Sequence, residues 1–336
     1  MAKEVEKYIP HDPHLLKLWP SLSGPVTVHT SPEGAEIYIR PYKQNSGVWE
    51  YLGRTPIEKK RLPFGFFRWK AEKPGFVPVE SAFFGAFEDD LHEITFQMFA
   101  KNVAIPGMVY VKGGSFSLQI PGFEGHPEVD LGNYWIDKSE VTNLEFKAFV
   151  QAGGYTNPKF WKQKFLRNGR KLSWKQAIAA FRDKTNRPGP STWEFGDYPA
   201  HQGDYPATGL SWYEAAAYAE FVGKSLPTVY HWTKPAAPWN AAYLVPASNF
   251  SGHGAAPVRS FRGLGPSGTY DMAGNAREWC SNAKGTDRYL MGGSWKDPAY
   301  IFTDGDAASP FDRSPKNGIR LVKYLVFTVK TGDRFN

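Results

Sequence analysis

Short stretches that alternate between apolar and polar residues fill the first part of the chain. They are PVTVHTSP (residues 25–32), AEIYIR (residues 35–40) and LHEITFQMF (residues 91–99). A period of two is typical of strands with one buried face. Between the first two stretches, Pro32 presets φ and Gly34 accepts a positive φ, which favours a tight turn. The pattern therefore predicts a small all-β unit over residues 24–100, with a hairpin across this turn.

Residues 101–336 show a different pattern, in which helical spacing alternates with short strands. Thr142 and Glu145 form a capping-box signature, which predicts a helix within residues 139–150. Ser211 is a candidate N-cap for a helix that ends at Gly223. A shorter helix is expected over residues 174–182.

Strands of this second part are expected at three places. Residues 107–120 read as a hairpin with Gly113 and Gly114 at its turn, and residues 134–137 read as a single strand. Residues 321–330 alternate like a closing strand. Before the all-β unit, residues 1–23 contain prolines at positions 10, 13 and 20, which interrupt helices. We interpret residues 1–23 as a helical connector.

Composition supports two domains rich in turns. The chain has 336 residues, of which 33 are Gly and 27 are Pro, and 41% are hydrophobic. A length of this size suggests about two domains, and the glycines and prolines favour short strands over long helices. The net charge is +7, but no run of Lys and Arg resembles a nucleic-acid-binding arm, so we expect no nucleic-acid partner.

Two further absences narrow the chemistry. Cys280 is the single cysteine, so an internal disulfide and a cysteine-rich metal site are excluded, and we expect it to be a small buried hydrophobe. The chain has neither an apolar run of membrane-spanning length nor the core of a signal peptide.

The segment GTYDMAGNAREWC (residues 268–280) combines small residues, turn formers and two carboxylates, Asp271 and Glu278. Backbone carbonyls freed by a turn, together with carboxylates, are the oxygen ligands that calcium prefers. The alternative is an Asx-turn that leads into a short strand, with Glu278 bonded to backbone amides.

This segment resembles a signature of the formylglycine-generating enzymes, also called sulfatase-modifying factors. Further matching pieces follow in the same order as in that family: GMVYVKGGSF (residues 107–116), YWIDKSEVTNLEFKAFV (residues 134–150), YPATGLSWYEAAAYAEFVGKSLPT (residues 205–228), LMGGSW (residues 290–295) and NGIRLV (residues 317–322). The resemblance implies an α+β fold, the C-type-lectin-like fold with much irregular structure, over residues 101–336. It also implies a structural calcium ion at Asp271, Gly274, Ala276 and Glu278, and a second calcium position at Asn249 and Phe250.

The all-β unit resembles the PEGA domain, which is named after the tetrapeptide found here at residues 32–35. PEGA domains are small spacer or surface modules of bacterial envelope and signalling proteins. The resemblance implies no catalytic role for residues 24–100.

The chain departs from the enzymes of the family where they carry two cysteines shortly after GGSW. Those thiolates bind Cu(I), which is a soft metal that sulfur ligands select. The corresponding positions here are Asp297 and Phe302. We therefore expect no copper, no formylglycine-generating activity and no catalytic residues of that kind.

Residues between positions 295 and 313 form a candidate ligand-binding face that could recognise a protein, a peptide or a small polar ligand. They are Trp295, Asp297, Tyr300, Asp304, Asp306, Phe311 and Arg313. The alternative is an internal lattice of salt bridges, in which Asp304 or Asp306 pairs with Arg313 and Arg320 is tied to core carbonyls.

Three functions remain open from the sequence. The first is a non-catalytic recognition or sensory module, that is, a pseudoenzyme in signalling. This function is suggested because the C-terminal sequence is similar to regions attached to bacterial serine/threonine kinases. The second is an enzyme of different chemistry that uses Asp297, Asp304 and Asp306 with His231 or Tyr300. The third is a display scaffold with variable ligand-binding loops. The resemblance implies a bacterial protein, either cytoplasmic or the extracytoplasmic part of a larger one.

Overall fold

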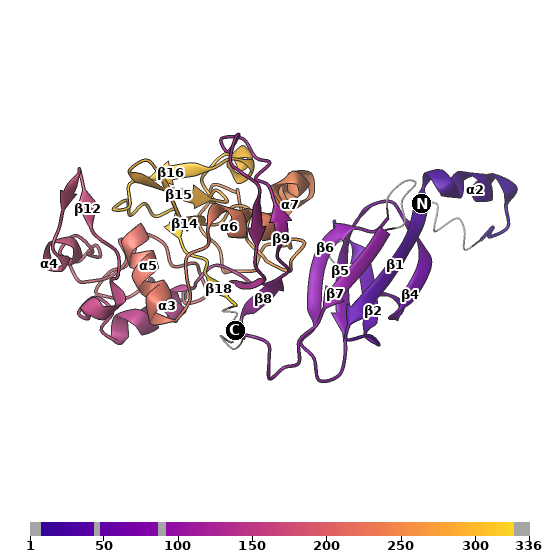
Figure 1. The fold of residues 1–336 in the computed structure, drawn as a ribbon, viewed down its shortest axis with the longest axis horizontal. Coiled ribbons are helices and arrows are strands. Elements are labelled where there is room, and N and C mark those ends of the chain that lie inside the picture. The colour runs from indigo at the N-terminus through magenta and orange to yellow at the C-terminus, as the bar shows by residue number, and fades with distance from the viewer. Residues whose placement is uncertain (1–7, 44–47, 87–91, 326–336) are drawn as a thin grey trace, which may run out of the picture.

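The protein consists of a strand-rich N-terminal part and a larger mixed C-terminal part that lie end to end (Figure 1). The computed structural model describes residues 8–43, 48–86 and 92–325. Helix α2 (Pro13–Leu18) precedes the strands, and Asp12 caps it by accepting from the amides of His14 and Leu15. A 3₁₀ turn, η1 (Trp19–Ser21), follows directly. The predicted connector is therefore helical in its described portion, and residues 1–7 of that prediction lie outside the described residues.

Two sheets form the N-terminal part. The first is three-stranded, in the order β4 (Ile57–Pro63), β1 (Ser23–Ser31), β7 (His92–Gln97). The second is four-stranded, in the order β3 (Glu50–Arg54), β2 (Glu36–Pro41), β5 (Phe66–Glu72), β6 (Val79–Phe84). Alternate side chains such as Val26, Val28, Ile37 and Ile39 are buried in one core around Trp69. The predicted all-β unit matches these strands, whereas its boundaries and the PEGA assignment stay predictions.

The predicted hairpin across residues 32–35 is wrong, because β1 and β2 lie in different sheets. Gly34 does take a positive φ of 88°. The turn is held by a side chain instead of a strand partner: the Thr55 hydroxyl accepts hydrogen bonds from the amides of Gly34 and Ala35, at 3.0 and 3.1 Å. The chain thus crosses from one sheet to the other at this turn.

Four short sheets run through the C-terminal part. One has the order β18 (Val322–Tyr324), β11 (Tyr134–Asp137), β8 (Met108–Val111), and another has the order β16 (Asp306–Ala308), β15 (Asp287–Met291), β14 (Arg277–Lys284), β17 (Asn317–Gly318). Two-stranded pairs are β10 (Val129–Leu131) with β9 (Gly114–Phe116), and β12 (Leu166–Arg167) with β13 (Arg170–Lys171). The predicted strand over residues 321–330 is confirmed in part by β18, and residues 326–330 lie outside the described residues.

The hairpin predicted around Gly113 and Gly114 is also wrong. Strand β8 pairs with β11, whereas β9 pairs with β10. Gly113 sits against the chain near Asn133, whose side-chain oxygen accepts from its amide at 2.8 Å. The two strands therefore separate at this point rather than fold back on each other.

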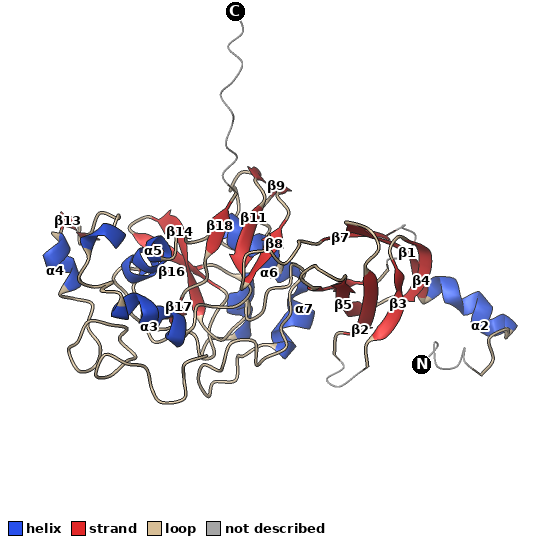
Figure 2. Ribbon diagram, turned by 90° about the horizontal axis from the view of Figure 1, so that it is seen from below, coloured by secondary structure: helices blue, strands red, loops and turns tan. Residues whose placement is uncertain are grey.

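Helices and 3₁₀ turns surround these sheets (Figure 1). They are α3 (Asn143–Gln151), α4 (Trp174–Ile178), α5 (Trp212–Phe221), α6 (Val229–Ala236) and α7 (Ala241–Leu244), with 3₁₀ turns η2 (Pro158–Phe160), η3 (Pro238–Asn240), η4 (Val245–Ala247) and η5 (Ala299–Thr303). Thr142 caps α3 and Ser211 caps α5, as predicted, and both caps are part of capping boxes. Figure 2 shows how much of this part is loop. None of the helices that the structure describes is long and apolar enough to span a membrane.

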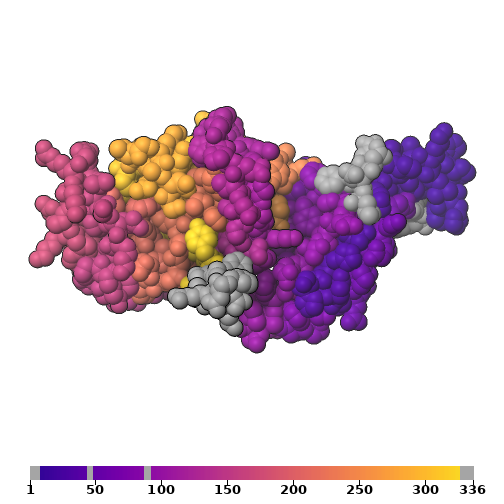
Figure 3. Space-filling model, viewed as in Figure 1, coloured from indigo at the N-terminus to yellow at the C-terminus, as the bar shows by residue number. Residues whose placement is uncertain are grey.

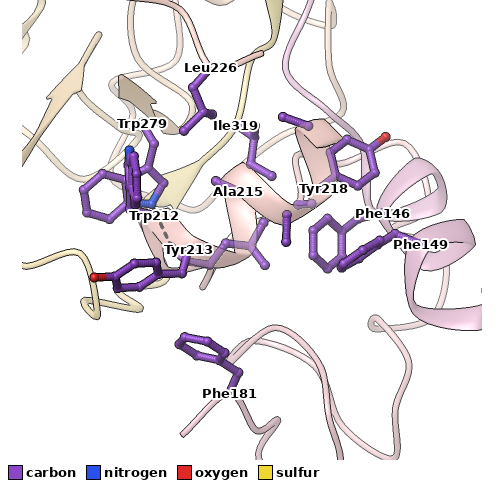
Figure 4. Close-up of a cluster of buried hydrophobic side chains, with 14 of the residues drawn as sticks. Phe146, Phe149, Phe181, Trp212, Tyr213, Ala215, Tyr218, Leu226, Trp279 and Ile319 are labelled. Atoms are coloured by element: carbon purple, nitrogen blue, oxygen red, sulfur yellow. Dashed lines mark hydrogen bonds between the residues drawn. The ribbon is translucent and has the colours of Figure 1, made fainter. Parts of the chain in front are cut away.

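The largest core surrounds α5. Aromatic side chains from α3 and α5 pack with Trp279 of β14 and with Ile319, which follows β17 (Figure 4). Phe146 and Tyr218 lie with ring centroids 5.2 Å apart. The three alanines Ala215, Ala217 and Ala219 are fully or almost fully buried, which lets neighbouring segments approach α5 closely.

A second core joins the two parts of the molecule. Tyr42, Phe66 and Ala82 of the N-terminal part belong to the same buried cluster as Trp232, Phe302 and other C-terminal residues. The Phe66 ring stacks on Tyr243 at 4.4 Å. In the space-filling view the two parts meet along a continuous boundary (Figure 3). The N-terminal and C-terminal parts therefore share a buried core.

Candidate functional site

The loop that leads into β14 contains the residues predicted to bind calcium. It takes left-handed backbone conformations at Asp271, Gly274 and Asn275, with φ values of 57°, 76° and 59°. At Gly274, a Cβ atom would lie 2.3 Å from the carbonyl oxygen of Asn249. Only glycine permits this close approach, which fixes the loop against the segment that carries Asn249.

Glu278 is held by an arginine at the centre of the molecule. Arg320 bonds both of its carboxylate oxygens from Nε, at 2.9 Å each, and the Trp232 indole donates to Oε2 at 2.6 Å. Glu278 and Arg320 are both fully buried. Arg320 also donates to the carbonyls of Asp137 and Tyr270, at 2.9 and 2.7 Å. The expected tie between Arg320 and core carbonyls is confirmed, and its ion pair with Glu278 is added to it.

Two more carboxyl groups lie in the same buried region. Glu140 is 1% exposed, and its Oε1 accepts from the Asn275 side chain at 3.0 Å. Its Oε2 has no hydrogen-bond partner among the described residues. Burial and the neighbouring charge of Asp271 raise the pKa of Glu140 well above its usual value. Burial likewise raises the pKa of Asp271 to about 6.

The residues predicted as calcium ligands fit that role in part. Asp271 faces a neighbouring carboxyl group, and the region holds more acidic groups than Arg320 alone can neutralise. However, both oxygens of Glu278 already accept from Arg320. In the described part of the chain, no three His, Cys, Asp or Glu side chains are grouped as metal ligands. An ion here would depend on Asp271 and on backbone oxygens such as those of Gly274 and Ala276.

The second predicted calcium position, at Asn249 and Phe250, lies on a segment that packs against this loop. The Asn249 side chain donates to the Gly254 carbonyl and to Asn275 Oδ1, at 3.0 Å each, and its own oxygen accepts from the Ser251 hydroxyl at 2.9 Å. Phe250 packs beneath Gly274 and Gly293. Asn249 thus connects the loop to its neighbours, and calcium at this second position stays a prediction.

Asp297 is one of the two residues predicted to stand where the family's enzymes have copper-binding cysteines. Its carboxylate accepts from Arg277 Nε at 2.6 Å and Nη2 at 2.9 Å, from Lys316 Nζ at 2.8 Å and from the Ser294 hydroxyl at 2.7 Å. Burial alone would raise its pKa, but these hydrogen bonds outweigh that effect and hold the pKa of Asp297 well below its usual value. The group is an ionised, fully engaged carboxylate.

Phe302, the residue predicted for the other cysteine position, is fully buried. It lies in the core shared by the two domains, and its ring centroid is 6.4 Å from that of Trp232. A phenyl ring in this place fills volume and offers no ligand atom. Cys280 is also fully buried, as predicted, and burial raises the pKa of its thiol well above the usual value.

The candidate ligand-binding face is divided by the structure. Asp306 pairs with Arg277, not with Arg313, so that part of the predicted lattice is wrong. Arg313 instead binds the buried Glu214, with Nε–Oε2 and Nη2–Oε1 distances of 2.8 and 2.9 Å. Phe311 packs on the rings of Phe181 and Tyr213. Asp297, Asp306, Phe311 and Arg313 are therefore structural contacts of this chain.

Solvent reaches several residues of that face, including the Asp306 side chain, which is 38% exposed. Tyr300 is 65% exposed, and Trp295 and Asp304 are half-buried. The acidic residues are not joined by His231, which lies between the rings of Tyr134 and Tyr324 at centroid distances of 4.7 and 4.8 Å. The structure does not bring together the acid and histidine group that an alternative enzyme would use.

Sequence reasoning missed three charged residues of this region, Glu140, Glu214 and Arg277. Each was visible only as part of a motif: Glu140 in SEVTN, Glu214 as the third residue after the cap Ser211, and Arg277 within NAREW. The role of Glu214 could have been predicted, because a capping box uses the residue three positions after the cap. The partners of Glu140 and Arg277 come from distant segments, so no local pattern pointed to them.

A model of the sulfatase-modifying factor enzyme 1-like domain matches residues 95–325. This chain belongs to the sulfatase-modifying factor family. As a member of that family, it has the expected mixture of strands, helices and irregular structure in its C-terminal part.

Relatives of this family member have different described roles. The chain is 29% identical over 223 residues to a formylglycine-generating enzyme of Thermomonospora curvata, which covers 52% of this chain and 71% of that protein. It is 28% identical over 221 residues to the serine/threonine-protein kinase pkn1 of Chlamydia caviae, covering 56% of this chain and 33% of the kinase. It is 26% identical over 251 residues to the inactive C-alpha-formylglycine-generating enzyme 2 of Mus musculus. That match covers 60% of this chain and 77% of the mouse protein.

The matched region spans only 33% of the length of the kinase relatives. Among solved structures, the protein is similar to CarF, with a TM-score of 0.42 and 21% sequence identity over 65% of this chain and 98% of that chain.

Proposed function

We propose that this member of the sulfatase-modifying factor family is a non-catalytic recognition or sensory module. The proposal is supported by the environment of Asp297 and Phe302, the two residues that we predict at the positions of the cysteine pair. Asp297 is a carboxylate engaged by Arg277, Lys316 and Ser294, and Phe302 is a buried phenyl ring. Neither group supplies the soft sulfur ligand that Cu(I) requires.

The relatives support a role in recognition. One similar protein is described as inactive, and another is a serine/threonine-protein kinase. We propose that this chain acts as the sensing or docking region of a kinase-associated protein, and that its ligand is a peptide or a small polar molecule. Trp295, Tyr300 and Asp304 are exposed or half-buried, and they lack the ion pair that holds Asp306 and the ring packing that holds Phe311. We propose these three as the contact residues.

The experiment that tests the non-catalytic assignment is an aldehyde assay. The purified chain is incubated with Cu(I), oxygen and a cysteine-bearing peptide, and the peptide is analysed by mass spectrometry. A formylglycine-generating enzyme serves as the positive control. We expect no conversion of cysteine to formylglycine by this chain, and no tight uptake of Cu(I) in a titration under reducing conditions. Detection of the aldehyde product would overturn the proposal.

A structural calcium ion is a separate proposal. It rests on Asp271, which lies beside Glu140 in a region with an excess of buried carboxyl groups. A divalent cation bound there would neutralise that charge, as hard cations do with oxygen ligands. The role we propose for the ion is to stiffen the loop that leads into β14.

A further inference from the structure

A cleft between the two domains contains an unusual concentration of positive charge. It has a volume of about 560 Å³, and its lining includes Lys43 and Arg68 from the N-terminal domain and Arg262 from the C-terminal domain. No Asp or Glu of the described residues lines it. A cavity of this size is in the range that holds small organic ligands.

Arg68 is the charged group at the base of this cleft. It is only 3% exposed, and its Nε donates to the Tyr42 carbonyl at 3.4 Å while Nη2 donates to the carbonyl of Arg262. Its guanidinium carbon lies 4.4 Å from the centroid of the Tyr42 ring. No ion pair joins Arg68 to a carboxylate of the described residues, and Nη1 has no acceptor among them.

A buried charge without a counter-charge is expensive for a folded protein. Charged side chains are almost never fully buried unless they are paired. Burial lowers the pKa of Arg68, and the like charges of Arg40 and Arg262 also lower it. Carbonyl oxygens satisfy two of its nitrogen donors but do not neutralise the charge.

The remaining walls of the cleft are suited to an organic group. Tyr243 and Phe261 present aromatic surface, and Ser260 contributes a hydroxyl at the exposed rim. Helix α7, which carries Tyr243, lies at the end of its domain that faces the N-terminal strands (Figure 1; Figure 2). Both domains therefore contribute to one lining, with cations on each side.

We infer that this interdomain cleft binds a small organic phosphate, with the phosphoryl oxygens between Lys43, Arg68 and Arg262 and the organic part against Tyr243 and Phe261. Guanidinium and ammonium donors form short, charge-assisted hydrogen bonds to phosphate oxygens. The site is distinct from the candidate face at Trp295 and Tyr300, so its ligand is independent of the function proposed above.

The test is calorimetric titration of the full chain with phenyl phosphate, inorganic phosphate and phenol as separate probes. We expect saturable binding of phenyl phosphate, weaker binding of inorganic phosphate and none of phenol. The double variant Lys43→Ala/Arg262→Ala removes two rim charges and keeps the Arg262 carbonyl that Arg68 bonds. It should weaken phenyl phosphate binding by about tenfold or more.

The matched control is Arg170→Ala, which removes an exposed arginine from the distant strand β13. It should bind phenyl phosphate as the wild type does. Circular dichroism melting of each variant separates lost binding from lost folding. The inference is wrong if wild-type protein shows no saturable binding of phenyl phosphate at millimolar concentration, if phenol binds equally well, or if the double variant binds with unchanged affinity.

Discussion

Three carboxyl groups and one guanidinium share the buried region around Arg320. Glu278 is neutralised by the arginine at 2.8 Å, which leaves Glu140 and Asp271 without a basic partner of their own. Burying an ionised carboxylate without compensation is strongly unfavourable, so this pair must be neutralised by protons or by a cation. The raised pKa values of Glu140 and Asp271 reflect this cost of burying charged carboxylates.

If calcium is the neutralising cation, it should stabilise the protein through Asp271. We expect added calcium to raise the melting temperature of chelator-treated wild-type protein by at least about 3 °C, because a ligand that binds only the folded state shifts the equilibrium towards it. The variant Asp271→Asn should lose this response. Differential scanning calorimetry at neutral pH measures both.

The control for this prediction is Glu124→Gln, which removes an exposed carboxylate elsewhere and should keep the full response. An unchanged melting temperature in wild-type protein would remove calcium from the account, and protonation would then be the means of neutralisation. An equal rise in Asp271→Asn would place the ion elsewhere.

For single residues, the sequence predicted burial better than it predicted ion-pair partners. It correctly predicted the burial of Cys280 and the tie between Arg320 and core carbonyls. It did not predict that Arg277 would bind Asp297 and Asp306, because these residues come from different strands and loops. A charge pair between segments far apart in sequence leaves no periodic trace that a local pattern could reveal.

Helix α6 shows how one element can contain a pH-dependent group. Thr228 caps the helix by accepting from the amide of His231 at 3.2 Å, and the same hydroxyl lies 2.6 Å from His231 Nδ1. Burial, aided by Lys234, lowers the pKa of His231 to about 4 from its usual 6.5. The folded state therefore favours the neutral imidazole.

This lowered pKa predicts a loss of stability in mild acid. Because the folded-state pKa is below the unfolded value, the stabilisation is complete above pH 6.5 and is lost as pH falls from about 6.5 to about 4. Allowing for partial solvent screening, we expect roughly 1 to 2 kcal/mol from this group. Urea denaturation at a series of pH values measures it.

The variant His231→Phe keeps an aromatic ring between Tyr134 and Tyr324 and cannot be protonated. Its free energy of unfolding should fall less over the same pH range than that of wild-type protein. The exposed residue His253 supplies the control, and His253→Phe should retain the wild-type acid sensitivity. Identical pH profiles for His231→Phe and wild-type protein would contradict the assignment.

Elements with local signals were predicted well, whereas strand pairings were not. Helices α3 and α5 have the predicted N-caps, Thr142 and Ser211, and β11 has the predicted bounds. Both predicted hairpins failed because the adjacent strands join different sheets. Turn residues specify that the chain turns, but they do not specify which distant strand pairs with the segment that follows.

Across the whole molecule, the shared core couples the unfolding of the N-terminal and C-terminal parts. Phe66 stacks on Tyr243, the Tyr42 hydroxyl donates to the Leu264 carbonyl at 3.1 Å, and Lys138 lies 3.8 Å from Glu80. Large apolar contact between domains couples their unfolding. We therefore expect wild-type protein to melt in a single cooperative transition.

Weakening this contact should separate the domains. The variant Tyr243→Ala removes the ring that stacks on Phe66, and we expect it to lower stability by roughly 1 to 3 kcal/mol and to split or broaden the calorimetric transition. Tyr51→Ala, which removes a ring that is 53% exposed on β3, is the control and should keep one transition. Two well-separated transitions in wild-type protein would contradict the coupling.

The engagement of Asp297 has an evolutionary consequence. A single exchange of this residue for cysteine would leave Arg277 and Lys316 without the anion that both of them bind, while Asp306 alone could not satisfy the pair. A second cysteine at position 302 would in addition empty space in the centre of the molecule. A cysteine pair at these two positions would thus require several coordinated replacements, because each single exchange removes an ion-pair partner or core volume.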